Sequence, residues 1–148
     1  RKEAKGLIGG YFETYPSVKA YMEKSIQIAQ EKGYVETIFH RKRFLPDINS
    51  RNAVVRGYAE RNAINAPIQG SAADIIKVAM ARIYQRFQTE GIQAKMILQV
   101  HDELNFSVPV NEKERVEEIV IEEMEHAYRM HVPLKADCGW GKNWLEAH

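Results

Sequence analysis

Three ionisable residues, His101, Asp102 and Glu103, stand between two apolar segments, M-I-L-Q-V before them and L-N-F-S-V after them. Apolar and polar residues alternate in the second segment, as in a half-buried strand, so the pattern predicts a β-hairpin with two carboxylates at its tip. Mg²⁺ takes carboxylate oxygens as ligands, and two such ions can clamp an in-line phosphoryl displacement. A polar turn without a ligand would show the same residues.

A hairpin tip supplies only part of a metal site, because neighbouring strand side chains point to opposite faces and Asp102 and Glu103 therefore diverge. A second carboxylate has to come from elsewhere. Asp74 is a candidate, but a serine three residues before it predicts a helix start instead, and Asp137 resembles a turn or edge residue. A metal phosphohydrolase built on the same turn would lack ligands too, since the remaining histidines follow no metal-binding spacing.

A second set of side chains, Arg61, Asn65 and Gln69, recurs every four residues. On a helix this spacing places them on one face. All three donate hydrogen bonds, and the minor groove of DNA offers acceptors at similar places on every base pair. These residues could therefore hold a duplex without reading its sequence, although a solvated helix face is the simpler interpretation of each one.

Charge is unevenly distributed. Residues 1–61 hold 12 Lys/Arg and 7 Asp/Glu, a balance of +5, and residues 62–148 hold 9 and 13, a balance of −4. A basic stretch suits a phosphate backbone, with a solvated charged face as the alternative; its cations are Arg41, Lys42, Arg43, Arg51, Arg56 and Arg61. We expect five glutamates to form a solvent-exposed helix face away from DNA: Glu117, Glu118, Glu122, Glu123 and Glu125.

Composition indicates a globular chain. It has 148 residues, 45% of them hydrophobic and 28% charged, and no apolar run long enough for a membrane span, so no membrane association is predicted. Cys138 is the only cysteine, which favours a reducing, cytoplasmic location. Because the chain opens with Arg1 and not methionine, we expect it to be part of a longer protein.

Proline and glycine divide the chain into helices. Pro16 ends a first helix, Gly33 ends a second, and Gly91 ends a third that begins near Asn52 and is interrupted at Pro67. A capping-box pattern over residues 111–114 starts a last helix, which runs to about residue 131.

The remaining apolar segments predict strands at residues 34–39, 44–46, 94–100, 104–108 and 134–138. Helices come first, followed by strands mixed with long helices. This order predicts an α+β fold with an antiparallel sheet.

Two longer segments carry a resemblance. R-N-A-I-N-A-P-I-Q-G-S-A-A-D-I-I-K (residues 61–77) and L-Q-V-H-D-E-L (residues 98–104) resemble the C-terminal part of the family A DNA polymerases, most closely those of bacteria. The resemblance extends over the whole chain. It implies that residues 1–50 are the trailing part of the fingers, with helices and a small hairpin. Residues 51–148 are then the C-terminal part of the palm, with a catalytic hairpin packed against long helices.

The resemblance also implies roles. Asp102 would be a catalytic carboxylate that binds two Mg²⁺ ions, Glu103 an auxiliary acidic group, and His101 a residue near the primer terminus. The other matched positions would contact template and primer DNA; they are Arg61, Asn65 and Gln69 in the minor groove, and Arg41, Lys42 and Arg43.

Two departures from the family pattern matter. His40 stands where the family's G-R-R-R turn has glycine, which leaves the geometry of that turn open. The family's other catalytic aspartate, in a D-Y-S-Q-I-E-L-R-like segment, and its nucleotide-binding helix, R-x-x-x-K-x-x-x-F-G, do not occur in the chain. The second carboxylate is therefore expected outside it.

We thus expect a fragment of a template-directed DNA polymerase of replication and repair, located in the cytoplasm at the nucleoid. In the parent, a primer 3′-hydroxyl attacks the α-phosphate of a dNTP. The isolated chain is expected to be inactive and to self-associate through surface that the rest of the parent would cover. The alternative function is a non-catalytic duplex-DNA-binding module.

Overall fold

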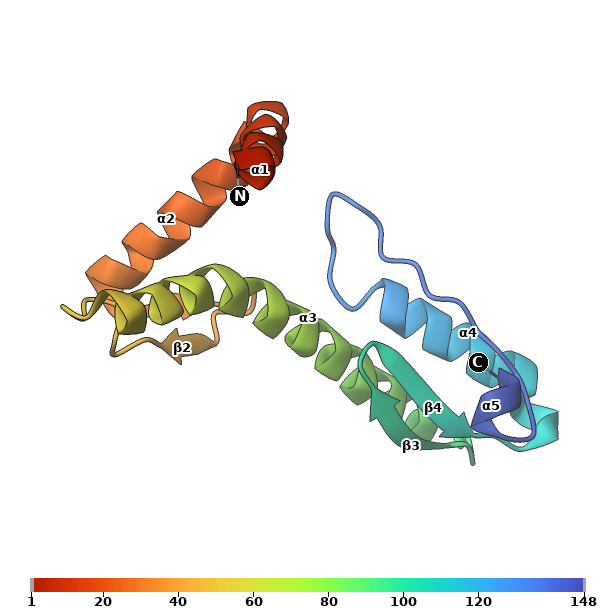
Figure 1. Ribbon diagram of the computed structural model, residues 1–148. Helices are drawn as coiled ribbons and strands as arrows, with labels where there is room; N and C mark the ends of the chain where they lie inside the picture. Colours follow the sequence, from red (N-terminus) through yellow and green to blue (C-terminus); the bar gives the residue numbers. More distant parts are fainter. Residues whose placement is uncertain (1, 148) are drawn as a thin grey trace. The chain divides into compact units, whose positions relative to one another are not determined.

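The computed structural model of the protein describes residues 2–147. The chain folds as two compact units, one ending at Ala72 and the other beginning at Ala73, and the long helix α3 (Ala53–Glu90) contributes to both. Each unit has its own antiparallel two-stranded hairpin and its own hydrophobic core. Figure 1 shows α3 running from the one hairpin to the other. The α+β class predicted from the order of elements is confirmed.

Two helices open the first unit, α1 (Lys2–Thr14) and α2 (Pro16–Lys32). The break falls where the sequence predicted it, because Pro16 has no N–H to continue α1 and instead occupies the first turn of α2. Gly33 ends α2 with a φ of 76°, a left-handed conformation without a Cβ clash. Its N–H bonds to the carbonyl of Ala29 at 2.8 Å, which confirms the predicted helix end.

The hairpin of the first unit consists of β1 (Tyr34–Glu36) and β2 (Lys42–Phe44). Both strands differ from the predicted ones because a turn begins at Thr37. Its N–H bonds to the carbonyl of Arg41, and its carbonyl accepts the N–H of His40. The core beneath this hairpin is small and is formed by Ala29, Val35, Leu45, Ile48, Ala59 and Ala63.

Helix α3 starts where Asn52 accepts the N–H of Val54 on its side-chain oxygen at 2.9 Å. The predicted interruption at Pro67 is wrong, since the helix continues through it. A proline removes one N–H, and the hydrogen bonds of the turns on both sides hold the helix together. The predicted helix start from Ser71 to Asp74 is also wrong, because both residues lie inside α3.

The second unit contains the hairpin of β3 (Lys95–Val100) and β4 (Glu103–Ser107), which confirms the hairpin predicted from alternation. The register shifts between Met96 and Leu98, as in a β-bulge. The core on which the hairpin packs is larger than that of the first unit and includes Ile83, Phe87, Ala94, Val116 and Ile119, with Leu104, Phe106 and Val108 partly buried against it.

A 3₁₀ turn, η1 (Val110–Glu112), and helix α4 (Lys113–Glu125) follow. The predicted capping box does not form. Instead the carboxylate of Glu112 accepts the N–H groups of Gln93 and Ala94 at 3.0 Å and ties α4 to the chain before β3. The helix also ends earlier than the predicted residue 131.

The strand predicted over residues 134–138 is not formed, and the chain there has no regular structure before the short helix α5 (Trp144–Ala147). A strand is defined by the ladder it makes with a neighbour, and the described residues offer this segment no ladder partner. Residues 134–138 have the β-propensity that the prediction used, but a strand also needs a neighbouring strand with which to form hydrogen bonds.

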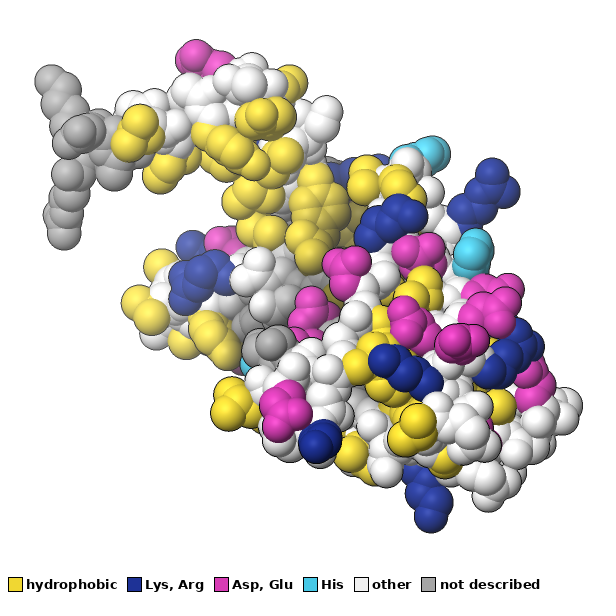
Figure 2. Space-filling view, turned by 90° about the vertical axis from the view of Figure 1, so that its right-hand side faces the viewer, with side chains coloured by type: hydrophobic (Ala, Val, Ile, Leu, Met, Phe, Trp, Pro, Cys, Tyr) yellow, Lys and Arg dark blue, Asp and Glu magenta, His cyan; other side chains and the backbone are white. Residues whose placement is uncertain are grey.

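Several large apolar side chains remain on the surface. In α1, Leu7 is 72% exposed and Tyr11 51%, and in β3 Ile97 is 63% exposed. Figure 2 shows hydrophobic side chains, in yellow, on the visible face of the molecule. Within residues 2–147, no helix is both long enough and apolar enough to cross a membrane.

Candidate metal-binding hairpin and nucleic-acid interface

The tip of the β3–β4 hairpin presents the two carboxylates. Val100 pairs with Glu103, so His101 and Asp102 form a two-residue turn. His101 has a φ of 53°, a left-handed conformation that costs a non-glycine residue about 1 kcal/mol or more and is held by the closed turn. Gln99 donates to the carbonyl of His101 at 3.0 Å and reinforces it. Asp102 is exposed and Glu103 half-buried, so Asp102 is the carboxylate available to a ligand in solution.

The apolar face of the hairpin fixes this tip to the second unit. Leu104 and Phe106 pack on the core that contains Ile83 and Ile119, and the rings of Phe87 and Phe106 lie 5.9 Å apart. A catalytic side chain must be held to within a fraction of an ångström, which a packed strand achieves better than a loop. The alternation of the sequence therefore places Asp102 on a rigid support.

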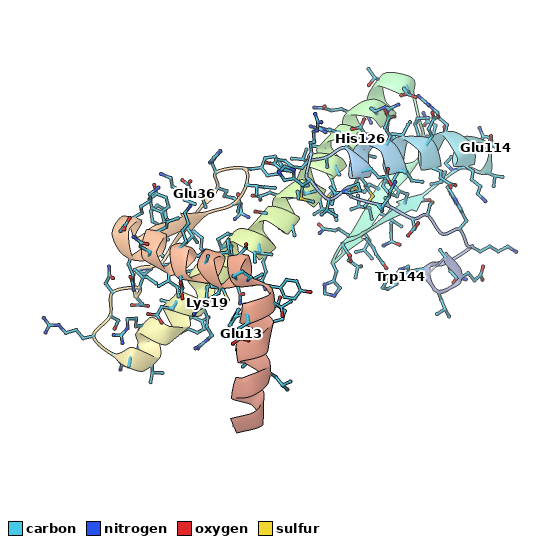
Figure 3. The ribbon with its side chains drawn as sticks, turned by 90° about the horizontal axis from the view of Figure 1, so that it is seen from above. Glu13, Lys19, Glu36, Glu114, His126 and Trp144 are labelled. Carbon is cyan, nitrogen blue, oxygen red and sulfur yellow. The ribbon has the colours of Figure 1, made fainter. Side chains whose placement is uncertain are left out.

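A groove of about 460 Å³ runs along the hairpin in the same unit. Asp102 and Glu103 line it together with β4, α4 and residues 135–141. The segment 135–141 is held to α4 by Trp140, whose ring N–H donates to Glu117 at 2.7 Å; Figure 3 labels Trp144 on α5, another residue of this lining. The groove gives further groups access to the carboxylates.

Asp102 and Glu103 fit Mg²⁺ by chemistry, because they offer hard oxygen donors at an accessible tip. They do not complete a site. Among residues 2–147 no three His, Cys, Asp or Glu side chains are placed to hold one ion. Asp137 lines the same groove without forming such a set, and Asp74 lies inside α3. The phosphohydrolase hypothesis lacks its ligands for the same reason.

The stripe of Arg61, Asn65 and Gln69 lies on α3 in the first unit, and all three side chains are exposed. Because α3 continues across Pro67, the spacing of four keeps them on one face, as the sequence indicated. The Arg61 guanidinium lies 5.8 Å from the centre of the Tyr58 ring.

The β1–β2 hairpin carries the basic residues of the same unit. β2 is exposed along its length, and the ammonium of Lys42 lies 4.4 Å from the centre of the Tyr34 ring. His40 has a φ of 62°, the conformation for which the family pattern has glycine, and histidine is one of the residues that adopt it most readily. Its ring lies 3.8 Å from the carboxylate of Glu36.

A small groove of about 220 Å³ joins this hairpin to α3. Arg41 and Arg43 line it from the hairpin, and Asn62 and Gln69 line it from the helix. Gln69 thus belongs both to the stripe and to the groove. The structure therefore brings the basic hairpin and Gln69, the last residue of the stripe, onto one polar surface, although they lie about 30 residues apart in sequence.

The expected solvent face of α4 is confirmed only in part, because Glu118 and Glu122 are exposed whereas the other three glutamates are half-buried. Arg86 of α3 binds Glu122 and Glu123 at 2.5 and 3.2 Å. Arg115 binds Glu90 at 2.7 Å. Hydrogen bonds from Arg115 lower the pKa of Glu90, and those from Arg86 lower the pKa of Glu122; the same contacts raise the pKa of Arg86. Sequence reasoning missed both arginines, since the local spacings of Arg86 to Glu90 and of Arg115 to Glu118 do not indicate the partners on the other helix.

Comparisons with known proteins agree with these motifs. A family model described as DNA polymerase family A matches residues 1–146. DNA polymerase I of Bacillus caldotenax is 54% identical and that of Streptococcus pneumoniae serotype 4 is 52% identical, each over 99% of this chain and 17% of the relative. A solved POL domain of Pol1 from M. smegmatis, in complex with DNA primer-template and dNTP, matches 99% of this chain and 26% of its own with a TM-score of 0.96 and 44% identity. The chain thus spans 17% of the length of the curated relatives cited here.

Proposed function

The chain belongs to DNA polymerase family A, and from that premise we propose that it is the part of a template-directed polymerase that holds one catalytic carboxylate and the duplex behind it. The reaction is nucleotidyl transfer in DNA replication and repair. The primer 3′-oxygen forms a bond to the α-phosphorus of a dNTP, the bond to the β-phosphate oxygen breaks, and pyrophosphate leaves with the electron pair.

The observation that carries the proposal is the exposed Asp102 at the tip of a hairpin anchored on a packed core. Asp102 would bind Mg²⁺, with Glu103 as an auxiliary acidic group and His101 close to the primer terminus. When bound, the ions would favour ionisation of the primer hydroxyl and offset the charge that develops on the phosphate. A second carboxylate would come from residues of the longer protein outside 2–147.

The polar surface of the first unit would bind the primer–template duplex. Arg61, Asn65 and Gln69 supply donors for minor-groove acceptors, which occur on every base pair and allow binding without sequence preference. The hairpin cations Arg41, Lys42 and Arg43 would contact phosphates. The neighbour from M. smegmatis was solved with DNA and a dNTP, which supports the same partners here.

The division of labour follows the family resemblance. We assign residues 1–50 to the trailing part of the fingers and residues 51–148 to the C-terminal part of the palm. This assignment concerns function, whereas the two compact units describe how the chain itself packs.

A non-catalytic duplex-DNA-binding module is the second candidate. One observation favours it: the polar surface of the first unit lies wholly within residues 2–147, whereas the metal site does not. In such a protein Asp102 would have no catalytic role.

The discriminating experiment replaces Asp102 by Ala in the full gene product that contains this chain. We expect primer extension to fall by at least about a thousandfold, equivalent to several kcal/mol of transition-state stabilisation, with duplex affinity changed less than about threefold. Asp137→Ala is the matched control, because it removes another exposed carboxylate of the same groove. Normal extension by the Asp102 variant would exclude the polymerase assignment and leave the binding module.

The 148-residue chain by itself should extend no primer, since it would hold only part of the metal site. It should also self-associate, because Leu7, Tyr11 and Ile97 expose apolar surface. Sedimentation velocity over a concentration series measures this, and a single monomeric species throughout would contradict it. Within the cell we expect the polymerase in the cytoplasm at the nucleoid, where its substrate is.

A further inference from the structure

The β1–β2 hairpin is joined to α3 at two consecutive residues, Gly70 and Ser71. The N–H of Ile38 donates to the hydroxyl of Ser71 at 2.9 Å, and the guanidinium of Arg41 donates to the carbonyl of Gly70 at 3.2 Å. Both contacts link the turn of the hairpin to the middle of the helix, about 30 residues further along the chain. Neither is needed to form the hairpin or the helix by itself.

The hydroxyl of Ser71 both donates and accepts a hydrogen bond. Its hydrogen is donated to the carbonyl of Pro67, one helical turn earlier, so an oxygen lone pair is left for the N–H of Ile38. Ser71 is only 9% exposed, so water cannot easily replace the contact. Removal of this hydroxyl would leave a part-buried N–H on the hairpin without its acceptor.

Gly70 allows the hairpin to come close. A Cβ at this position would lie 2.7 Å from the methyl carbon of Thr37, which is shorter than any ordinary contact. Thr37 cannot readily turn away, because it is 7% exposed and its hydroxyl accepts the N–H groups of Phe39 and Arg41 at 3.3 and 3.2 Å. Glycine is required here for space, since the residue lies inside α3.

We propose that Gly70 and Ser71 are positioning residues for DNA binding, and we call their contacts with Ile38, Thr37 and Arg41 the hairpin latch. The latch holds the basic hairpin against α3 so that Arg41 and Arg43 face the same groove as Gln69. One strand of the duplex then meets phosphate-binding cations and amide donors at a fixed separation. This inference rests on the duplex-binding role proposed above and adds the residues that align its two halves.

The first test is Ser71→Ala in the full gene product, with Ser71→Thr as the matched control that keeps the hydroxyl. Binding of a fluorescein-labelled primer–template duplex is followed by anisotropy between about 50 and 200 mM salt. We expect the affinity of the Ala variant to fall about three- to tenfold. The slope of the logarithm of the binding constant against the logarithm of the salt concentration is negative. Its magnitude should fall by about one for each phosphate that the hairpin no longer contacts. The Thr variant should retain both values.

The salt slope separates positioning from simple loss of folding. A smaller folded fraction lowers the amount of active protein but leaves the slope of the remainder unchanged. An unchanged slope in Ser71→Ala would therefore overturn the inference.

A second test asks whether the latch acts through the cations. In a background of Arg41→Gln and Arg43→Gln, Ser71→Ala should have little further effect on affinity, because the groups it positions are gone. An equal loss in both backgrounds would assign Ser71 a purely structural role.

The third test uses the close approach of Gly70 to Thr37. Gly70→Ala should weaken binding although alanine favours a helix more than glycine does. Thr37→Ser removes the methyl group and keeps the hydroxyl, so it should change little by itself and restore binding to the Gly70→Ala variant. Failure of this rescue would show that Gly70 does not act through Thr37.

Together, the variants distinguish the duplex-binding role of the hairpin from the positioning role of the hairpin latch. If the Arg41 and Arg43 background itself binds DNA with unchanged affinity and slope, the duplex-binding role of the hairpin fails. If that background loses affinity while the Ser71 and Gly70 variants do not, only the latch fails.

Discussion

The two hairpins of the protein share one device and carry opposite charge. Each turns at a histidine with a left-handed backbone, His40 with a φ of 62° and His101 with a φ of 53°. In the first hairpin the histidine is followed by Arg41, Lys42 and Arg43, and in the second by Asp102 and Glu103. The turn therefore fixes where the next side chains point, and their charge decides whether the tip suits phosphate or a metal ion.

The supports of the hairpins differ as well. Both hairpins rest on an apolar core, β3–β4 on the one that includes Phe87 and Ile119, and β1–β2 through Val35 on a smaller one. The turn of the β1–β2 hairpin is in addition linked to α3 by the polar contacts of Ser71 and Gly70. Apolar packing resists displacement in every direction, which suits a catalytic ligand. The two hydrogen bonds of the first hairpin align its turn with α3, which suits contact with a long, uniform backbone.

The first prediction concerns the apolar support and has the largest expected effect. Ile119 is fully buried, so Ile119→Ala should destabilise the second unit by about 2–5 kcal/mol. Amide hydrogen exchange of β3, β4 and α4 should quicken, while the amides of β1 and β2 change little. Equal loss of protection in both hairpins would mean that they do not have separate supports.

The second prediction concerns the charge of the first hairpin. Replacing Arg41 and Arg43 by Gln should lower duplex affinity about tenfold at about 0.1 M salt and reduce the salt slope by about two. The extension rate at saturating DNA should stay unchanged. A double variant of Lys19 and Lys24, which removes the same charge from α2, is the control and should leave the slope near its original value.

A smaller effect on stability is expected when the backbone strain at the two histidines with positive φ is removed. His40→Gly and His101→Gly should each stabilise the local hairpin by about 0.5–1 kcal/mol, because glycine adopts a positive φ without the strain that a side chain brings. Hydrogen exchange of the flanking strands gives the value for each turn. Destabilisation at one position only would show that its histidine side chain has a further role.

The smallest effect concerns acid stability of the second unit. Arg86 and Arg115 hold the folded-state pKa values of Glu122 and Glu90 below their ordinary values. The two ionised glutamates therefore stabilise the folded unit fully above about pH 4.3. This stabilisation is lost as the pH falls through the lower folded-state pKa values. Arg86→Met should therefore make the stability of this unit less dependent on pH below that point. If the stability of the Arg86→Met variant and of the unmodified protein depended on pH in the same way, the ion pairs of Arg86 would not contribute to acid stability.

Several elements could be predicted from neighbouring residues alone. Pro16 and Gly33 set helix ends through missing N–H and Cβ groups, and the alternation from Leu104 to Val108 predicted β4. The segments that contain Asp102 and the stripe of Arg61, Asn65 and Gln69 carry the family resemblance, and the family they indicated is confirmed. The roles of these residues follow from the resemblance and stay predictions.

Local sequence was sufficient to place the helix ends at Pro16 and Gly33 and the alternation in β4, because those properties depend on groups a few bonds apart. The family followed from longer motifs of the chain. Tertiary structure decided the rest. The carboxylate of Glu112 accepts the N–H groups before β3, Ser71 supports a hairpin rather than starting a helix, and Arg86 of α3 pairs with Glu122 of α4. Each of these polar groups found a partner 18 to 37 residues away, and short-range periodicity carries no information about contacts at that separation.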